Sequence, residues 1–314
     1  MIFGMEIVMT EFLDLAALQR ELGMGTWAMA DCSVGADGMI YLLFSACVPE
    51  RINGMFVDTR ANTEYRGLAI AADWQDGTIL GWERYDFGVH EMNYHFIQPV
   101  GEDILLLGAR ARRYRDGSAD QNAVIVDRYG RKLHKMCLGD GIESCAVTRD
   151  GRMITSYFDE GVFGNFGWDQ PVGSCGLIVW DRDGNAVWKN RAYSICDCYA
   201  MNLDDQENLW FYYYDEFNLV RTDFKSKDWV FKPRRDGITA FLVTASGRGL
   251  LTDGGYGKHG QFHYYEFRGM NLAYKAPVDV VYNGKTLSFN WLHFRGAKAV
   301  LVDNCGRLFC REIL

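Results

Sequence analysis

The chain has 314 residues, of which 48% are hydrophobic and 24% charged, as is typical of a folded globular protein. Its formal net charge of −8 disfavours a nucleic-acid backbone or an anionic membrane as a partner, because both require a basic surface. There is no signal-peptide pattern and no apolar run of about 18 residues, so we expect a cytoplasmic protein. Aromatic residues make up 14%, and 34 glycines stand against 5 prolines, which favours many short strands joined by tight turns.

The first predicted elements are a strand and a short helix. Residues 2–9 (IFGMEIVM) are apolar and β-prone. Residues 10–23 carry apolar side chains at helical spacing, between Thr10, which can cap the start, and Gly23, which can end it. We expect this helix to pack over the edge of a sheet, which is a structural role.

Hairpins of two kinds then alternate along the chain. The first kind has an apolar strand, a polar turn, and a second strand rich in β-branched or aromatic residues; its clearest copies, at 142–160 and 195–216, end in Asp-Glu. Asp150-Gly151 is a strong turn signal in the first of these. Weaker copies cover residues 27–46, 92–109, 238–255 and 289–304. The second kind, with a glycine-containing turn after an aspartate, lies at residues 68–85, 123–136 and 176–190.

One hairpin of each kind makes a four-stranded blade, and the first kind begins six times at intervals of roughly 40–60 residues. We therefore predict an all-β fold, a six-bladed β-propeller formed by a single domain over residues 1–314. Only residues 307–314 follow the last hairpin, so the N-terminal strand is expected to complete the last blade and cover its edge. Seven blades, or a pair of β-sandwiches, are the alternatives.

Acidic and amide residues at the strand ends are the candidate ligand-binding residues. In a propeller, the connection before the first strand and the connection after the second strand of each blade open on one face, where such folds usually bind ligands. The residues that follow second strands are Asp159, Glu160, Asp215, Glu216, Asp253 and Asp303. The residues near the start of first strands are Asp31, Asn93, Glu143, Asp197 and Asn290.

These oxygen donors have two interpretations. They form an acidic funnel suited to Ca²⁺ or Mg²⁺, or to a sugar or amine ligand. Alternatively, each aspartate only closes a turn by accepting backbone N–H groups. Glu143 and Asp197 occupy matching places in the two clearest hairpins, so we expect their carboxylates to lie near each other.

The remaining features are less specific. The glycine-rich loops 161–175 and 252–263 are either binding loops or plugs packed on a neighbouring blade. The basic run 110–115 is interpreted as a solvated loop. Nine cysteines contain no CxxC pair and are expected to be reduced and mostly buried. No nucleophile elbow, HExxH, P-loop or EF-hand pattern occurs, so the sequence leaves open whether the protein is an enzyme.

Repeats of the form xxDGxxW/YxxY, with acids at the channel mouth, resemble six-bladed propellers of the NHL and gluconolactonase-like kind over the whole chain. The strings at 157–164 (YFDEGVFG) and 197–202 (DCYAMN) are also similar to those of uncharacterised bacterial propeller proteins. The gluconolactonase-like resemblance implies a divalent ion held by Glu143, Asp197, Asn93 and Asn290. The predicted function is a propeller that binds a small polar molecule or a protein partner; the alternative is a divalent-metal-dependent hydrolase of the lactonase kind that acts on a small polar substrate.

Overall fold

The computed structural model describes residues 5–52, 55–56 and 58–314, and these divide into two compact units. The amino-half unit comprises residues 19–71 and 81–198, and the carboxy-half unit comprises residues 1–18, 72–80 and 199–314. The prediction of a single domain over residues 1–314 stays a prediction.

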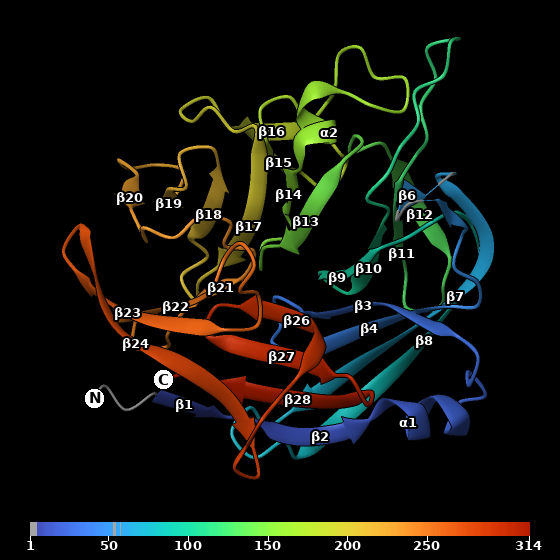
Figure 1. Cartoon of the computed structure of the whole chain (residues 1–314). Coiled ribbons are helices and arrows are strands. Elements are labelled where there is room, and N and C mark those ends of the chain that lie inside the picture. Colours follow the sequence, from blue (N-terminus) through green and yellow to red (C-terminus); the bar gives the residue numbers. More distant parts are fainter. Residues whose placement is uncertain (1–4, 53–54, 57) are drawn as a thin grey trace. The chain divides into compact units, whose positions relative to one another are not determined.

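Blades 1 to 3 belong to the amino-half unit, apart from the tip of the β7–β8 hairpin (Figure 1). Blade 1 contains β3 (Ala28–Val34), β4 (Ile40–Ser45), β7 (Arg60–Ala72) and β8 (Ile79–Met92). The short strands β5 (Arg51–Ile52) and β6 (Met55–Phe56) follow β4 in the sequence and pair with each other. Blade 2 contains β9 (Phe96–Val100), β10 (Asp103–Leu107), β11 (Ala123–Val126) and β12 (Lys132–Met136). Blade 3 contains β13 (Ile142–Val147), β14 (Met153–Tyr157), β15 (Leu177–Trp180) and β16 (Ala186–Lys189), with helix α2 (Asp159–Phe163) between β14 and β15.

Blades 4 to 6 belong to the carboxy-half unit, except that the first two residues of β17 are grouped with the amino-half unit. Blade 4 contains β17 (Asp197–Leu203), β18 (Leu209–Tyr214), β19 (Leu219–Thr222) and β20 (Trp229–Phe231). Blade 5 contains β21 (Phe241–Val243), β22 (Gly249–Asp253), β23 (Phe262–Arg268) and β24 (Asn271–Tyr282), extended by β25 (Lys285–Thr286) and β1 (Met5–Val8). Blade 6 contains β26 (Phe289–Arg295), β27 (Lys298–Asp303), β28 (Arg307–Glu312) and β2 (Thr10–Asp14).

Five four-stranded sheets and one six-stranded sheet, counted over the described residues besides the β5–β6 pair, make the fold a six-bladed β-propeller, as predicted. An N-terminal strand does complete the last blade, but it is β2, which pairs with β28. The earlier strand β1 instead runs parallel to β24 in blade 5 (Figure 1). The predicted N-terminal helix is present only as α1 (Leu15–Glu21), because residues 10–14 are drawn into the sheet.

Among the described residues, four hydrophobic core clusters each draw their side chains from two neighbouring blades of one unit. Leu105 and Ile125 of blade 2 pack with Met153 and Ile178 of blade 3, and a similar cluster joins blades 5 and 6. The second strands lie inside this packing, so all six residues of β4 are buried. In the outer strands, side chains either alternate between buried and exposed or face solvent, as four of the five residues of β12 do. Polar groups therefore occur mainly at the first residues of the inner strands and in the adjoining loops.

Aspartates close several of the tight turns between strands. Asp127, Asp181, Asp204 and Asp303 each accept two backbone N–H groups from residues two and four positions further on. This is the turn-closing role that the sequence offered as the alternative to ligand binding, and it accounts for Asp303. Neither helix in the described part of the chain is long and apolar enough to cross a membrane.

Candidate functional site

Two carboxylates from strand starts come together in the amino-half unit. Glu143 is the second residue of β13, and Asp197 is the first residue of β17. Burial, followed by the charge of Asp197, raises the pKa of Glu143 to about 7. The two side chains therefore lie close enough to repel each other when both are ionised.

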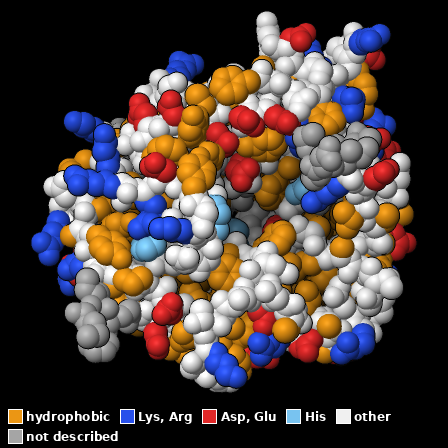
Figure 2. Space-filling model, viewed as in Figure 1, with side chains coloured by type: hydrophobic (Ala, Val, Ile, Leu, Met, Phe, Trp, Pro, Cys, Tyr) orange, Lys and Arg blue, Asp and Glu red, His pale blue; other side chains and the backbone are white. Residues whose placement is uncertain are grey.

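A third carboxylate joins them from the start of α2. Burial, followed by the charge of Asp159, raises the pKa of Asp197 to about 6. Asp159 itself is exposed, and its Oδ1 accepts the Glu160 N–H at 2.7 Å. We call Glu143, Asp197 and Asp159 the acid cluster. Figure 2 shows acidic side chains gathered over α2 and the neighbouring end of β13.

The acid cluster is accessible to water, yet surrounding protein atoms partly desolvate its carboxylates. The side chain of Glu143 is exposed and that of Asp197 is half-buried, yet burial is the main cause of both raised pKa values. Both facts hold where surrounding protein atoms displace bulk water without covering the carboxylate itself. No described residue donates a hydrogen bond or an ion pair to the carboxylate of Glu143 or Asp197. These two groups are left to water or to a ligand.

Glu160, beside the acid cluster, is neutralised by an arginine. Arg110 Nη1 lies 2.6 Å from Glu160 Oε2. The same guanidinium donates two parallel hydrogen bonds of 2.9 Å to the carboxylate of buried Asp140, which also accepts the Ala111 N–H. Arg110 therefore has two carboxylate partners already and is not available to neutralise the acid cluster.

The long loop after α2 packs on the basic run of blade 2. Arg110 lies over the Phe166 ring at 4.4 Å, and Arg113 lies over the Trp168 ring at 5.3 Å. The Trp168 Nε1–H donates to the Ala111 carbonyl at 2.7 Å. The predicted solvated loop is confirmed for Arg113 and Arg115, which are exposed, whereas Arg110 and Arg112 are half-buried over the Phe166 ring.

Asn93 is buried and pairs with a histidine that the sequence reasoning did not single out. The Asn93 carboxamide lies 3.3 Å from His95 Nε2, and His95 Nδ1 accepts the Ala109 N–H at 3.0 Å. Because Nδ1 accepts a hydrogen bond, the proton of the neutral ring lies on Nε2, the nitrogen beside the Asn93 side chain. Burial lowers the pKa of His95 to about 4, so the ring is neutral at pH 7.

Asp31 joins two blades rather than facing a ligand. Its Oδ2 accepts the Ile97 N–H at 2.9 Å, while the neighbouring Ser33 hydroxyl donates to the Ile97 carbonyl at 2.9 Å. Both backbone groups of Ile97 in β9 are thereby held by side chains of β3. Burial raises the pKa of Asp31 to about 7 despite these hydrogen bonds. A buried carboxylate with such partners is most simply a structural group.

Three of the four predicted acids of the carboxy-half unit, Asp253, Glu216 and Asp303, are satisfied by the protein itself. Asp253 is buried and accepts hydrogen bonds from the Thr239 N–H and hydroxyl, and it pairs with His259 Nδ1 at 2.8 Å. Glu216 accepts from the Tyr213 hydroxyl at 2.7 Å and from the Asn218 amide at 2.6 Å. Asp215 and Asn290 are exposed.

The donor set implied for a divalent ion is not assembled among these residues. The Asn93 carboxamide is turned to His95, and Asn290 belongs to the other unit. Within the part of the chain that the structure describes, no three His, Cys, Asp or Glu side chains are placed to hold one metal ion. All nine cysteines are free thiols, of which four are buried. Ca²⁺ takes six to eight oxygen ligands, several of them from protein in most sites, and the residues present do not supply such a set.

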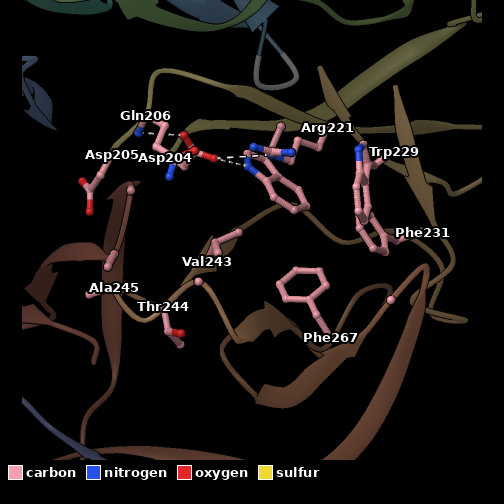
Figure 3. Close-up of a pocket in the computed structure, with 15 residues that line it drawn as sticks. Asp204, Asp205, Gln206, Arg221, Trp229, Phe231, Val243, Thr244, Ala245 and Phe267 are labelled. Atoms are coloured by element: carbon pink, nitrogen blue, oxygen red, sulfur yellow. Dashed lines mark hydrogen bonds and ion pairs between the residues drawn. The ribbon is translucent and has the colours of Figure 1, made fainter. Parts of the chain in front are cut away.

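A recess of about 280 Å³ lies in the carboxy-half unit between blades 4 and 5 (Figure 3). The ring of Phe231 packs against Phe267 at 5.0 Å and against Trp210 at 5.6 Å. Asp204 accepts the Trp210 Nε1–H at 2.9 Å and lies 3.7 Å from Arg221. Because its aromatic walls contact one another and its charged groups are paired, we interpret this recess as a gap in the packing.

No protein-family model matches the chain, and no curated protein matches its sequence. Solved structures that resemble it include a gluconolactonase from Xanthomonas campestris, with 13% identity, 92% of this chain and 86% of that chain covered, and a TM-score of 0.49. A virginiamycin B lyase from Staphylococcus aureus, solved with quinupristin, has 11% identity, 92% and 96% coverage, and a TM-score of 0.44. YCF48 bound to D1 peptide has 12% identity, 91% and 92% coverage, and a TM-score of 0.47. Likeness at this level carries no activity from one propeller to another, because unrelated functions share the fold.

Proposed function

We propose that the protein is a ligand-binding propeller whose acid cluster holds a small polar molecule through a positively charged amino group. The observation that carries this proposal is the pair Glu143 and Asp197, whose pKa values are raised to about 7 and about 6 and whose carboxylates accept nothing from the described protein. Carboxylates that are held close and partly desolvated must bind a cation, bind hydrogen-bond donors, or keep a proton.

The charges around the site favour a cationic ligand. Arg110 is occupied by Asp140 and Glu160 and leaves the acid cluster without a protein counter-charge. A divalent metal is disfavoured because no three described His, Cys, Asp or Glu side chains are placed to hold one ion. An ammonium group supplies both a positive charge and up to three donors, and so matches two carboxylates that accept but cannot donate when ionised.

Binding of an amine should depend on pH in a defined direction. A bound cation favours the ionised carboxylates, so it lowers the pKa of Glu143 and Asp197 and displaces their protons. Affinity should therefore rise as the pH increases from about 5 to about 8, across the raised values of about 6 and about 7. A ligand bound only by neutral hydroxyl groups brings no charge and can also accept from the protonated carboxyls, so it should release fewer protons.

The test is calorimetric titration of the full chain with putrescine at pH 5.5 and pH 8, in two buffers of different ionisation enthalpy. We expect saturable binding at pH 8 with proton release near pH 6.5, lost in Glu143→Gln and Asp197→Asn. Glu102→Gln removes an exposed carboxylate from the turn between β9 and β10 and should leave binding unchanged. A lysine-containing peptide, titrated in parallel, shows whether a protein side chain occupies the same site.

Equal putrescine binding by the parent, Glu143→Gln and Asp197→Asn would disprove the proposal, as would the absence of binding by putrescine and peptide alike. The cytoplasmic location expected from the sequence stays a prediction.

A further inference from the structure

A groove of about 670 Å³ lies in the carboxy-half unit, between the segment that follows β20 and the β23–β24 hairpin. Its volume is within the range of small-molecule sites, about 300–1,000 Å³. The charged residues that line it are Lys232, Arg234 and Arg235, and no acidic residue is among the described lining residues. In a chain of net charge −8, a cationic groove is an exception. Figure 2 shows Lys and Arg side chains gathered over this part of the unit, which we call the basic groove.

Arg235 is held in place by neutral groups only. Its Nε donates to the Tyr265 hydroxyl at 3.2 Å, and its Nη1 donates to the Gly254 carbonyl at 3.3 Å. Its side chain is half-buried, and no described carboxylate pairs with it. These hydrogen bonds orient the guanidinium without neutralising it, so the charge remains available to an anion.

The backbone of the same segment brings three cations to one side of the groove. Arg234 adopts φ 55°, in the left-handed region that residues with a side chain rarely occupy. The buried Pro233 fixes the chain just before it. Lys232 and Arg234 are exposed and, like Arg235, have no ion-pair partner among the described residues. A conformation that is costly for arginine and crowds like charges points to a functional constraint.

A half-buried histidine in contact with the groove residue Tyr274 lacks hydrogen-bond partners. Both ring nitrogens of His263 are buried without a hydrogen-bond partner in the described residues. The ring contacts Tyr274, which lines the groove, at a centroid distance of 5.9 Å. Burial, together with the charges of Arg235 and Lys258, lowers the pKa of His263, so the ring is neutral and can donate one hydrogen bond and accept another. Unpartnered polar atoms of this kind are rare and point to a bound ligand or an ordered water.

We propose that the basic groove is a second ligand site, which binds a small organic phosphate. Arg235, Arg234 and Lys232 hold the phosphate group, and Met270, Leu272 and Tyr274 contact the organic part. A phosphate dianion matches three unpaired cations better than a single carboxylate does, and a guanidinium fork suits its oxygens. This site is separate from the acid cluster and does not depend on it.

The test is calorimetric titration of the full chain at low ionic strength with phenyl phosphate, inorganic phosphate and benzoate. We expect saturable binding in the order phenyl phosphate, inorganic phosphate, benzoate, and weakening with added salt. Arg235→Gln should weaken phenyl phosphate binding about tenfold or more, as expected for loss of a charge-assisted hydrogen bond. The double variant Lys232→Gln/Arg234→Gln changes only exposed side chains, so it tests the site even where Arg235→Gln affects folding.

Arg248→Gln is the matched control, because Arg248 is an exposed arginine of the same unit outside the groove. Its binding should equal that of the parent, as should that of Glu143→Gln. Unchanged binding in the double variant, or no saturable binding of either phosphate, would overturn the proposal. Tighter binding of a single-stranded oligonucleotide, lost in the same variants, would replace the small ligand with a nucleic acid and overturn it as well.

Discussion

The acid cluster and the acids of the carboxy-half unit contain the same residue types at comparable ends of strands, but their surroundings differ. Asp253 and Glu216 follow second strands and are fully engaged by hydroxyl, amide and backbone donors. Asp159 also follows a second strand, yet it adds a charge to Asp197 and leaves Asp197 unsatisfied. Residue type and repeat position therefore do not determine the role of these acids; the supply of hydrogen-bond donors around each carboxylate does.

The largest effect should come from a satisfied acid. Asp140→Ala removes the doubly bonded partner of Arg110, whose side chain is only 12% exposed, and should lower the free energy of unfolding by about 3 kcal/mol. Urea denaturation measures this loss. Glu102→Ala, at an exposed turn of the same unit, should unfold at the parent's urea midpoint. Equal midpoints for both variants would remove the distinction between engaged and unengaged acids.

Asp253→Ala should be the next most damaging change, with a loss of about 2 kcal/mol, because buried donors from Thr239 and Gly255 would lose their acceptor. Asp215→Ala, at the matching strand end of blade 4, removes an exposed carboxylate and should leave stability unchanged. Thermal unfolding of the two variants side by side checks the prediction. If Asp253→Ala were more stable than the parent, Asp253 would be an unsatisfied carboxylate like those of the acid cluster, and the prediction would be wrong.

The opposite sign is expected in the acid cluster. Glu143→Gln removes a repelled charge and should raise the free energy of unfolding at pH 8 by about 1 kcal/mol, a value already reduced for the exposure of the side chain. Asp197→Asn should act in the same direction. Both variants are measured by urea denaturation at pH 8. A clear loss of stability in both, without any ligand found, would show that these carboxylates are structural.

The smallest effect is a difference in pH dependence. The pKa of Glu143 is raised from 4.5 to about 7 in the folded protein, so its protonated form adds stability below pH 4.5, and this contribution is lost as the pH rises through about 7. Subtracting the profile of Glu143→Gln from that of the parent should leave a decline confined to this interval. Asp31, whose pKa is also raised to about 7, is present in both proteins and cancels. A flat difference would mean that Glu143 titrates normally.

The fold could largely be predicted from the sequence. Asp150-Gly151 and Asp37-Gly38 mark turns where the glycines adopt φ values of 82° and 79°, and the alternating hairpins between such turns give six blades. The N-terminal boundary could not be predicted in the same way. Residues 10–14 have a helical pattern, but pairing with β28 supplies hydrogen bonds and burial that a single turn of helix cannot.

The sequence predicted which residues belong to the candidate site, but not the role of each residue. Local patterns pointed to Glu143, Asp197 and Asp159 together with Asp31, Asn93 and Asp253, because all are polar groups at strand ends. Their different roles depend on partners that lie far away in the chain: Ile97 is 66 residues from Asp31, and Arg110 is 30 residues from Asp140.

The basic groove shows the same division between sequence and structure. The run 232–235 (KPRR) is plain in the sequence, but the lack of counter-charges around it appears only when β23 and β24 are placed beside it. Local sequence determines where strands, turns and charges occur, because those depend on neighbouring residues. Which charges are left unpaired depends on distant donors and acceptors, and only the tertiary structure brings these together or keeps them apart.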